Sequence, residues 1–331
     1  MADVTDHSAT GLRAAVLEPF RSHEWVNASA VCVGGSSCDA GPDLVLLRRT
    51  VGLWKVAGLP LPKSATPMSA GLGGTPIEND AALWRLAAWF QESDLSLLQV
   101  TSATPPPEGL QCSRVEMIEN LEIPVGEHTC ESLWSRMSKL PQRQIRRALK
   151  AGVRVHRVAP SVEHLARLRS LSSAIYASTR ERPIHDPRQH AAMATEPLSK
   201  GLTMFAVSIC GETLGYLLSV QHAGRSYYWD VAVDEKGRGL GAGHLLVWIW
   251  MRWCKRRGVG IVDFIGPPEG GRAGGRPGIG RFKVSFGAVA RPYWVVYWTR
   301  HGAGFALDCS RFLAMLRRRL LDLRLPDSPR R

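Results

Sequence analysis

Three closely spaced glycines lie between a predicted strand and a predicted helix in the second half of the chain. Residues 226–233 are rich in aromatic and β-branched side chains, which favour a strand, and residues 244–257 have the apolar content of a packed helix. Between them, Arg238–Gly243 has the sequence RGLGAG. Glycines let a phosphate approach backbone N–H groups closely, and the start of a helix adds the positive end of its dipole. The pattern therefore predicts a binding site for a pyrophosphate group. The amides expected to donate are those of Gly239, Gly241, Ala242 and Gly243.

The elements that would hold this loop alternate between strands and helices, which predicts an α/β fold with a mixed sheet. The turn sequence Pro-Pro-Glu-Gly follows a helix and a strand twice, at 106–109 and at 267–270. We infer two similar halves, of which only the second has the glycine loop. The predicted strands are 44–47, 52–56, 95–101, 204–209, 214–222, 226–233 and 261–264, and the predicted helical segments are 78–92, 131–150 (a linker between the halves) and 244–257.

The composition limits the class of partner. The 331 residues carry a net charge of +13, which favours acidic partners such as a nucleotide, a phosphorylated lipid, RNA or a membrane surface. The seven cysteines are scattered and form no Cys-x-x-Cys pair, and the histidines are not clustered. This pattern is typical of thiols in a reducing cytoplasm and predicts no metal site. The first residues do not resemble a signal peptide, and the longest apolar run, 245–250, is too short to span a membrane.

The residues of the loop resemble the central motif of the GNAT acyltransferase superfamily. That motif is a strand followed by Arg/Gln-x-x-Gly-x-Gly/Ala and a helix, and Arg238–Gly243 fits it at every position. The resemblance implies that the loop, including Arg238, binds the pyrophosphate of acyl-CoA as a co-substrate. Acetyl-CoA is the simplest donor, and no permanently bound cofactor is expected.

Three further segments resemble the FemAB-like and CelD-like branch, which is built from two GNAT-type halves. They are the basic segment 140–153, the strand end Asp263–Gly266 (DFIG) and Phe282–Gly287 (FKVSFG). Fem transferases that use aminoacyl-tRNA generally lack a complete CoA loop, whereas this chain has one. The resemblance therefore favours acyl-CoA over aminoacyl-tRNA as the donor.

The resemblance also implies roles in acyl transfer to an amine. Backbone N–H groups near Val231 and Val233 would stabilise the developing oxyanion. The amine must lose a proton, and Asp230, Asp263 or an ordered water would accept it. A structural alternative for Asp263 is hydrogen bonding to loop amides. Side-chain alternation predicts that Asp230 faces the same side of its strand as Tyr228 and Ala232.

Two other side chains are expected near the substrate. Tyr228, like Tyr227, would be a core aromatic or line the wall of the substrate cleft rather than donate a proton. Lys283 follows a glycine-rich loop, 266–280, and would neutralise a phosphate or polarise a carbonyl; the alternative is a lysine that reaches from the surface. The loop itself would be a substrate lid or a plain surface loop.

A basic helix is predicted in the linker. From Ser132 to Val162 there are eight Lys or Arg residues and no acidic one. Arg143, Arg146, Arg147 and Lys150 follow the spacing of one helical face, where crowded like charges disfavour the helix unless an anion binds. We expect Arg146 and Arg147 to contact an anionic small-molecule or lipid-linked acceptor, with the CoA 3′-phosphate as another candidate and a merely solvated face as the alternative. Nucleic acid ranks lowest because no aromatic residues alternate with the cations.

The C-terminal segment 308–325 predicts an amphipathic helix with leucines on one side and arginines on the other. Packing against the first half is one interpretation, and contact with an anionic membrane surface is the other. The protein is expected in the cytoplasm, with the inner face of the membrane as the site of any such contact.

Together these features predict an enzyme of four segments. They are a degenerate GNAT-like half (1–125), a basic helical linker (126–160), a GNAT acyltransferase half (161–300) and a basic tail (301–331). The predicted activity is transfer of an acyl group, acetyl in the simplest case, from CoA to an amine of a cell-envelope or polysaccharide precursor. The alternatives are a Fem-type transferase that uses aminoacyl-tRNA on peptidoglycan precursors, where tRNA would be a partner, and a non-catalytic envelope-assembly protein.

Overall fold

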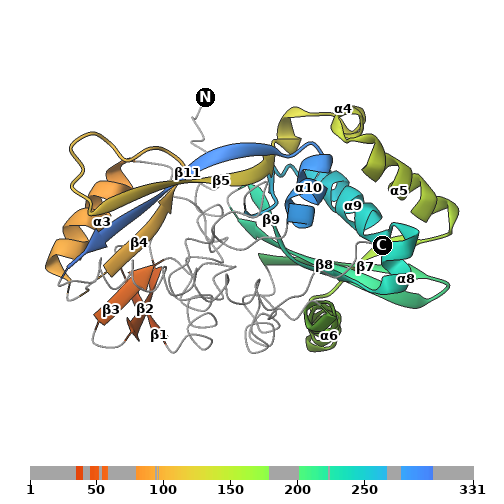
Figure 1. Cartoon of the computed structure of the whole chain (residues 1–331), viewed down its shortest axis with the longest axis horizontal. Helices are drawn as coiled ribbons and strands as arrows, with labels where there is room; N and C mark the ends of the chain where they lie inside the picture. Colours follow the sequence, from red (N-terminus) through yellow and green to blue (C-terminus); the bar gives the residue numbers. More distant parts are fainter. Residues whose placement is uncertain are drawn as a thin grey trace, which may run out of the picture.

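One continuous mixed sheet organises the molecule (Figure 1). The computed structural model describes residues 35–39, 45–51, 54–58, 80–93, 95, 97–178, 201–222, 224–266 and 277–300. These residues form eleven strands in the order β1-β2-β3-β4-β11-β5-β10-β9-β8-β7-β6. The predicted α/β fold with a mixed sheet is confirmed. The predicted C-terminal helix at 308–325 and most of the predicted lid, 267–276, lie outside the described residues.

The strands and helices have the following bounds. The strands are β1 (Gly35–Asp39), β2 (Val45–Val51), β3 (Trp54–Gly58), β4 (Leu97–Ser102), β5 (Arg114–Ile123), β6 (Arg154–Val158), β7 (Leu202–Ile209), β8 (Glu212–His222), β9 (Arg225–Val233), β10 (Ile261–Asp263) and β11 (Val289–Thr299). The helices are α3 (Asp80–Glu92), a single 3-10 turn (Val125–Glu127), α4 (Cys130–Arg136), α5 (Lys139–Lys150), α6 (Val162–Ser178), α8 (Glu235–Leu240), α9 (Ala242–Arg256) and α10 (Pro277–Ser285).

Helices cover both faces of the second half of the sheet. Helix α9 is apolar around most of its circumference, which is typical of a buried helix. It packs with α4, α5 and α10 on one face, where Leu246 and Trp250 are fully buried. Helix α6 lies on the opposite face and contributes Leu165 and Leu168 to a second core cluster. We refer to the two sides as the α9 face and the α6 face.

The predicted linker helix is two helices with a break between them. The Thr129 side chain caps the start of α4 by accepting a hydrogen bond from Ser132 N–H at 3.1 Å. Met137 has extended backbone angles and ends α4. The Gln142 amide then donates to the carbonyls of Trp134 and Met137, each at 3.0 Å, which ties the start of α5 to the end of α4.

Strand β11 makes the two halves one sheet. It pairs antiparallel with β4 of the first half on one side and with β5 on the other. Strand β5 in turn pairs with β10 of the second half. Neither β5 nor β11 is predicted from the sequence, so the continuity of the sheet is a finding of the structure. Among the described residues, no helix has the length and apolar content that crossing a bilayer requires.

Candidate active site

The candidate site lies where strands β9 and β10 stop pairing. The two strands are parallel, and β10 ends at Asp263 while β9 continues to Val233. On the side of β9 that faces β8, the N–H of Asp234 donates to a carbonyl of β8 at 2.9 Å. Because successive amides of a strand point to alternate edges, the amides of Val233 and Val231 face the β10 side. Beyond Asp263 this edge has no strand partner among the described residues.

A β-bulge determines which face of the sheet Asp230 occupies. The register between β8 and β9 shifts between the residues that oppose Tyr228 and Asp230, so Trp229 is an extra residue. Tyr228 belongs to the core of the α9 face, whereas the Asp230 carboxylate accepts a hydrogen bond from the Ser172 hydroxyl of α6 at 3.4 Å. The prediction that Tyr228 and Asp230 share a face is therefore wrong, because the bulge reverses the alternation. Ala232 does lie on the α6 face with Asp230.

Tyr228 is part of an aromatic cluster. Its ring lies 5.6 Å from Trp250 and 5.5 Å from Phe264, and the residue is 7% exposed. Burial raises the pKa of the Tyr228 hydroxyl, and the nearby charge of Asp230 raises it further. The hydroxyl therefore stays protonated at neutral pH. Its predicted contact with a substrate stays a prediction.

The glycine segment is not the open loop that the sequence predicts. Residues 235–240 form helix α8, whose first turn is capped by the Asp234 carboxylate accepting from Gly237 N–H at 2.6 Å. A single residue, Gly241 with φ of 80°, separates α8 from α9. The Gly241 N–H donates to the Arg238 carbonyl at 3.1 Å, so this amide is not the available donor that the sequence predicts. Gly239 lies within α8.

The amides of Ala242 and Gly243 remain at the start of α9. The first hydrogen bonds of this helix come from His244 and Leu245, both to the carbonyl of Gly241, at 3.1 and 3.2 Å. The two preceding amides have no partner within a helix of this geometry. A Cβ on Gly243 would contact only a methyl of Val233 at 3.7 Å, so there is room beside this residue, whereas Ala242 is buried.

Helix α5 packs directly against this turn. A Cβ on Gly241 would lie 2.6 Å from the carbonyl oxygen of Gln144, so only glycine fits. Arg147 is three residues after Gln144 and shares its flank of α5. Arg146 lies on the other flank, with its guanidinium 5.3 Å from the ring centre of Trp134. The two predicted substrate contacts therefore lie on different flanks of α5, with Arg147 on the flank of Gln144.

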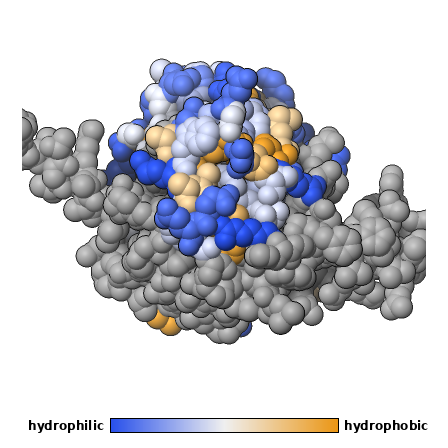
Figure 2. All heavy atoms as spheres, turned by 90° about the vertical axis from the view of Figure 1, so that its left-hand side faces the viewer, coloured by the Kyte–Doolittle hydropathy of each residue, from blue (hydrophilic) through white to orange (hydrophobic). Residues whose placement is uncertain are grey.

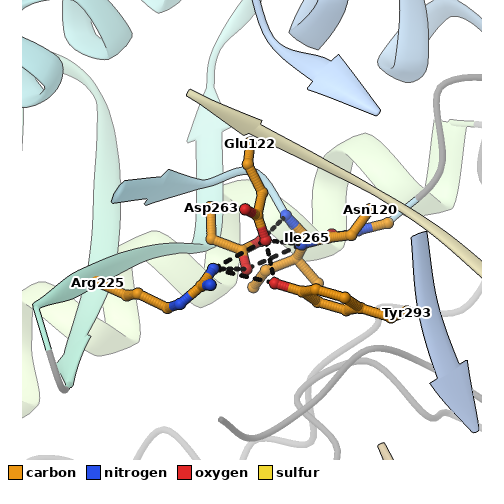
Figure 3. Close-up of polar contacts among 7 residues, drawn as sticks. Asn120, Glu122, Arg225, Asp263, Ile265 and Tyr293 are labelled. Carbon is orange, nitrogen blue, oxygen red and sulfur yellow. Dashed lines mark hydrogen bonds and ion pairs between the residues drawn. The ribbon is translucent and has the colours of Figure 1, made fainter. Parts of the chain in front are cut away.

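Next to the point where β9 and β10 stop pairing is a buried cluster of charged side chains (Figure 3). One oxygen of Glu122 accepts hydrogen bonds from Arg225 at 2.8 Å, from the Asn120 amide at 3.1 Å and from the Tyr293 hydroxyl. The same Asn120 amide donates to Asp263 at 2.9 Å, and the guanidinium lies 3.9 Å from that carboxylate. These residues come from β5, β9, β10 and β11, so the cluster joins all four strands.

The charges of this cluster are unequal, with one guanidinium facing two carboxylates. Burial and the charge of Glu122 raise the pKa of Asp263 to about 6. Burial alone would lower the pKa of Arg225, but Tyr293 and Glu122 raise it overall, so the guanidinium stays charged. Burial also raises the pKa of the Tyr293 hydroxyl, which stays a donor. The cluster therefore takes up a proton on Asp263 in mildly acidic solution.

The turn that follows Asp263 is held from three sides. Ile265 has φ of 53°, an uncommon conformation for a branched residue, and its N–H donates to the Asp263 carboxylate at 2.7 Å. The Gly266 N–H donates to the Asn120 side-chain carbonyl at 2.9 Å. The buried Lys283 ammonium donates to the Ile265 carbonyl at 2.5 Å. Lys283 therefore connects α10 to the end of β10, a position that the sequence does not predict.

Four members of this cluster are absent from the sequence prediction: Asn120, Glu122, Arg225 and Tyr293. The sequence signal for Glu122 is a carboxylate between Leu121 and Ile123, which are both buried. A charged residue is expected at such a position only when it is paired. Its partners lie more than one hundred residues away in sequence and are identified only by the strand order.

Comparisons with known proteins agree with this geometry. Residues 136–283 match the model of a family described as Acetyltransferase (GNAT) domain. The fold is that of a GNAT acetyltransferase. The match supports an N-acyltransferase, as the sequence predicts. A search of curated proteins finds no significant match.

Solved structures share the fold of the GNAT domain and of the half that precedes it. FemX has a TM-score of 0.64 and 12% identity, covering 87% of this chain and 94% of its own. The C-terminal domain of a putative lysylphosphatidylglycerol synthetase from Agrobacterium fabrum has a TM-score of 0.58 and 11% identity, with coverage of 91% and 95%. L-PGS from Bacillus licheniformis has a TM-score of 0.55 and 13% identity, with coverage of 95% and 98%. At these identities the likeness shows the fold alone.

Proposed function

We propose that the protein transfers an acyl group, acetyl in the simplest case, from CoA to an amine of a cell-envelope or polysaccharide precursor in the cytoplasm. The observation that carries the proposal is the edge of β9 beyond the end of β10, beside the start of α9, where the part of the chain that the structure describes provides no partner strand. This edge presents the amides of Val231 and Val233, and the helix start presents those of Ala242 and Gly243. The amides of Val231 and Val233 suit a developing oxyanion, and those of Ala242 and Gly243 suit a pyrophosphate.

The residues at the start of α9 suit the CoA pyrophosphate. The amides of Ala242 and Gly243 precede the hydrogen bonds of the helix, and no side chain covers Gly243. The Arg238 guanidinium donates to the Val233 carbonyl at 3.1 Å, which fixes a cation between the two sets of amides. Arg147 on α5 adds a second cation at the same turn. CoA supplies the thioester that is cleaved.

Asp230 is the better candidate for accepting the proton of the amine. Both oxygens of Asp263 are engaged, one by Ile265 N–H and one by Asn120, so this carboxylate positions the turn. Asp230 adjoins Val231 on β9 and faces α6, where Ser172 donates to it at 3.4 Å. In the proposed reaction the amine nitrogen attacks the thioester carbonyl and its proton passes to Asp230 or to a water that it orients. The C–S bond then breaks, and CoA leaves as the thiolate, which takes up the proton from Asp230 or from that water.

Calorimetric titration with acetyl-CoA tests the donor site. We expect saturable binding that Gly243→Glu weakens at least tenfold, because a carboxylate would face the phosphates. Ser170→Glu adds the same charge on exposed α6 and should bind acetyl-CoA as the wild type does. Absence of saturable binding, or equal weakening by both variants, would refute the proposed site.

A second candidate donor is aminoacyl-tRNA, acting on a peptidoglycan precursor. It is favoured by the fold similarity to FemX over most of both chains, which also supports the FemAB-like branch. Incubation with a charged-tRNA mixture and an amine acceptor separates the two donors. Transfer of a labelled amino acid without acetyl-CoA binding would establish the tRNA-dependent reaction, and acetyl-CoA binding without such transfer would exclude it.

A further inference from the structure

Helix α5 presents a basic surface that the acyl-transfer site does not account for. The helix contains no acidic residue, and of its five cations only Arg147 is used in the proposed donor site. All are exposed, and among the described residues no ion pair involves them. The residues of this basic surface are Lys139, Arg143, Arg146 and Lys150.

The fold holds α5 in place without help from these charges. Ile145 and Ala148 are fully buried against α9, and Gln142 ties the helix to α4 through two hydrogen bonds. Packing therefore compensates for the repulsion between like charges at helical spacing. A rigid array of cations remains, which is suited to a large anionic partner.

Exposed leucines accompany the cations. Leu140 and Leu149 are 47% and 48% exposed at opposite ends of α5, although leucine is usually buried. The two leucines are nine residues apart and therefore lie on opposite flanks of the helix, one on each side of the cations. Lysine, arginine and leucine together suit the boundary between lipid headgroups and acyl chains. Binding of single-stranded RNA depends on exposed aromatic rings, and α5 has none.

We propose that α5 binds the anionic phospholipid surface of a membrane. The binding itself does not require the acyl-transfer activity; only its purpose, to hold the site beside a lipid-linked acceptor, rests on the proposed function. The proposed membrane contact is limited to the side of the molecule formed by α5. Helix α6 lies on the opposite face of the sheet (Figure 1), and the end of the molecule formed by α3 shows hydrophilic and hydrophobic residues intermixed (Figure 2).

Vesicle co-sedimentation of the full chain tests the proposal. We expect binding to phosphatidylcholine vesicles that contain phosphatidylglycerol, little binding to phosphatidylcholine alone, and weaker binding at high salt. Arg143→Ala/Lys150→Ala should lower the affinity about 30-fold, from about fivefold for each cation near an anionic surface. Leu140→Ser/Leu149→Ser should lower the binding that persists at high salt.

A matched control removes the same charge elsewhere. Arg167→Ala/Arg169→Ala takes two exposed cations from α6 and should bind the vesicles as the wild type does. Equal loss in this control, or wild-type binding by Arg143→Ala/Lys150→Ala, would overturn the proposal. If tRNA without an attached amino acid displaces the protein from vesicles at a lower concentration than soluble phosphatidylglycerol does, the surface would be assigned to RNA instead. The same variants are also titrated with acetyl-CoA. If they bind acetyl-CoA as the wild type does, a loss of vesicle binding does not come from failure of the donor site.

Discussion

Replacing Arg225 tests whether the buried charged cluster stabilises the strands that form the site. The guanidinium is 10% exposed, donates to Glu122 at 2.8 Å and to Tyr293 at 3.0 Å, and lies 3.9 Å from Asp263. Arg225→Met keeps much of the side-chain volume and leaves two buried carboxylates without their cation. Breaking a buried ion pair in this way costs about 3–5 kcal/mol. We therefore expect the free energy of unfolding to fall by that amount at pH 7.5.

Urea denaturation followed by circular dichroism measures this change, with an unchanged slope as evidence that only stability is altered. Adding Glu122→Gln to Arg225→Met should restore most of the loss, because one of the uncompensated charges disappears. Lys236→Met breaks the solvent-exposed pair of Lys236 with Glu212 and should have little effect. If Arg225→Met changes stability no more than Lys236→Met does, or if Glu122→Gln brings no recovery, the Arg225 guanidinium does not compensate buried carboxylate charge in this cluster.

Three other predictions concern the same region. The raised pKa of Asp263 means that the folded state binds this proton more tightly than the unfolded chain, so the free energy of unfolding should fall by up to about 3 kcal/mol as the pH rises from 4 to above 6. Asp263→Asn should remove that slope in urea titrations at several pH values, and an unchanged slope would contradict the assignment. Gly241→Ala should destabilise the protein by at least about 1–2 kcal/mol, because φ of 80° disfavours alanine and the new Cβ meets Gln144. Gly239→Ala, with nothing within 4 Å, should be neutral or stabilising by up to about 1 kcal/mol, and equal effects of the two in thermal melts would contradict this account. Lys283→Met should expose the 263–266 turn to faster hydrogen exchange while β7 and β8 keep their protection; uniform exchange across the domain would argue against a local role for Lys283.

Local sequence signals predict most of the second half of the fold. The alternation and β-branched content of 204–233 predict the three-stranded meander, and the apolar run from 244 predicts α9 within two residues of its bounds. Both signals come from neighbours in sequence, and both elements pack against a core that the same residues define.

Other parts depend on interactions that the sequence pattern does not show. Residues 235–240 have two glycines and appear unsuited to a helix, yet the Asp234 cap and the short connection to α9 stabilise α8. Strand β5 alternates apolar and charged residues, but one of its edges is paired only because β11 returns from the far end of the chain. The partners of Glu122 follow from that pairing, so a local analysis does not find them.

The bulge in β9 shows how a single extra residue changes the chemistry of the site. In a regular strand, Asp230 would face α9 with Tyr228, inside an aromatic core where an unpaired carboxylate is costly. The extra residue turns Asp230 to the α6 face, and the parallel register places Asp263 on that face as well, opposite Tyr227. Two carboxylates from adjacent strands thus lie on one side of the sheet, while the amides at the start of α9 lie beyond the end of β9. An acceptor amine would approach from the α6 face and the donor phosphates would lie near α9. Deleting Trp229 would make Tyr228 and Asp230 neighbours on a regular strand, so Asp230 should stay on the α6 face. A variant that folds, binds acetyl-CoA and still transfers the acyl group is the outcome that this geometry requires, and loss of transfer with acetyl-CoA binding intact would contradict it.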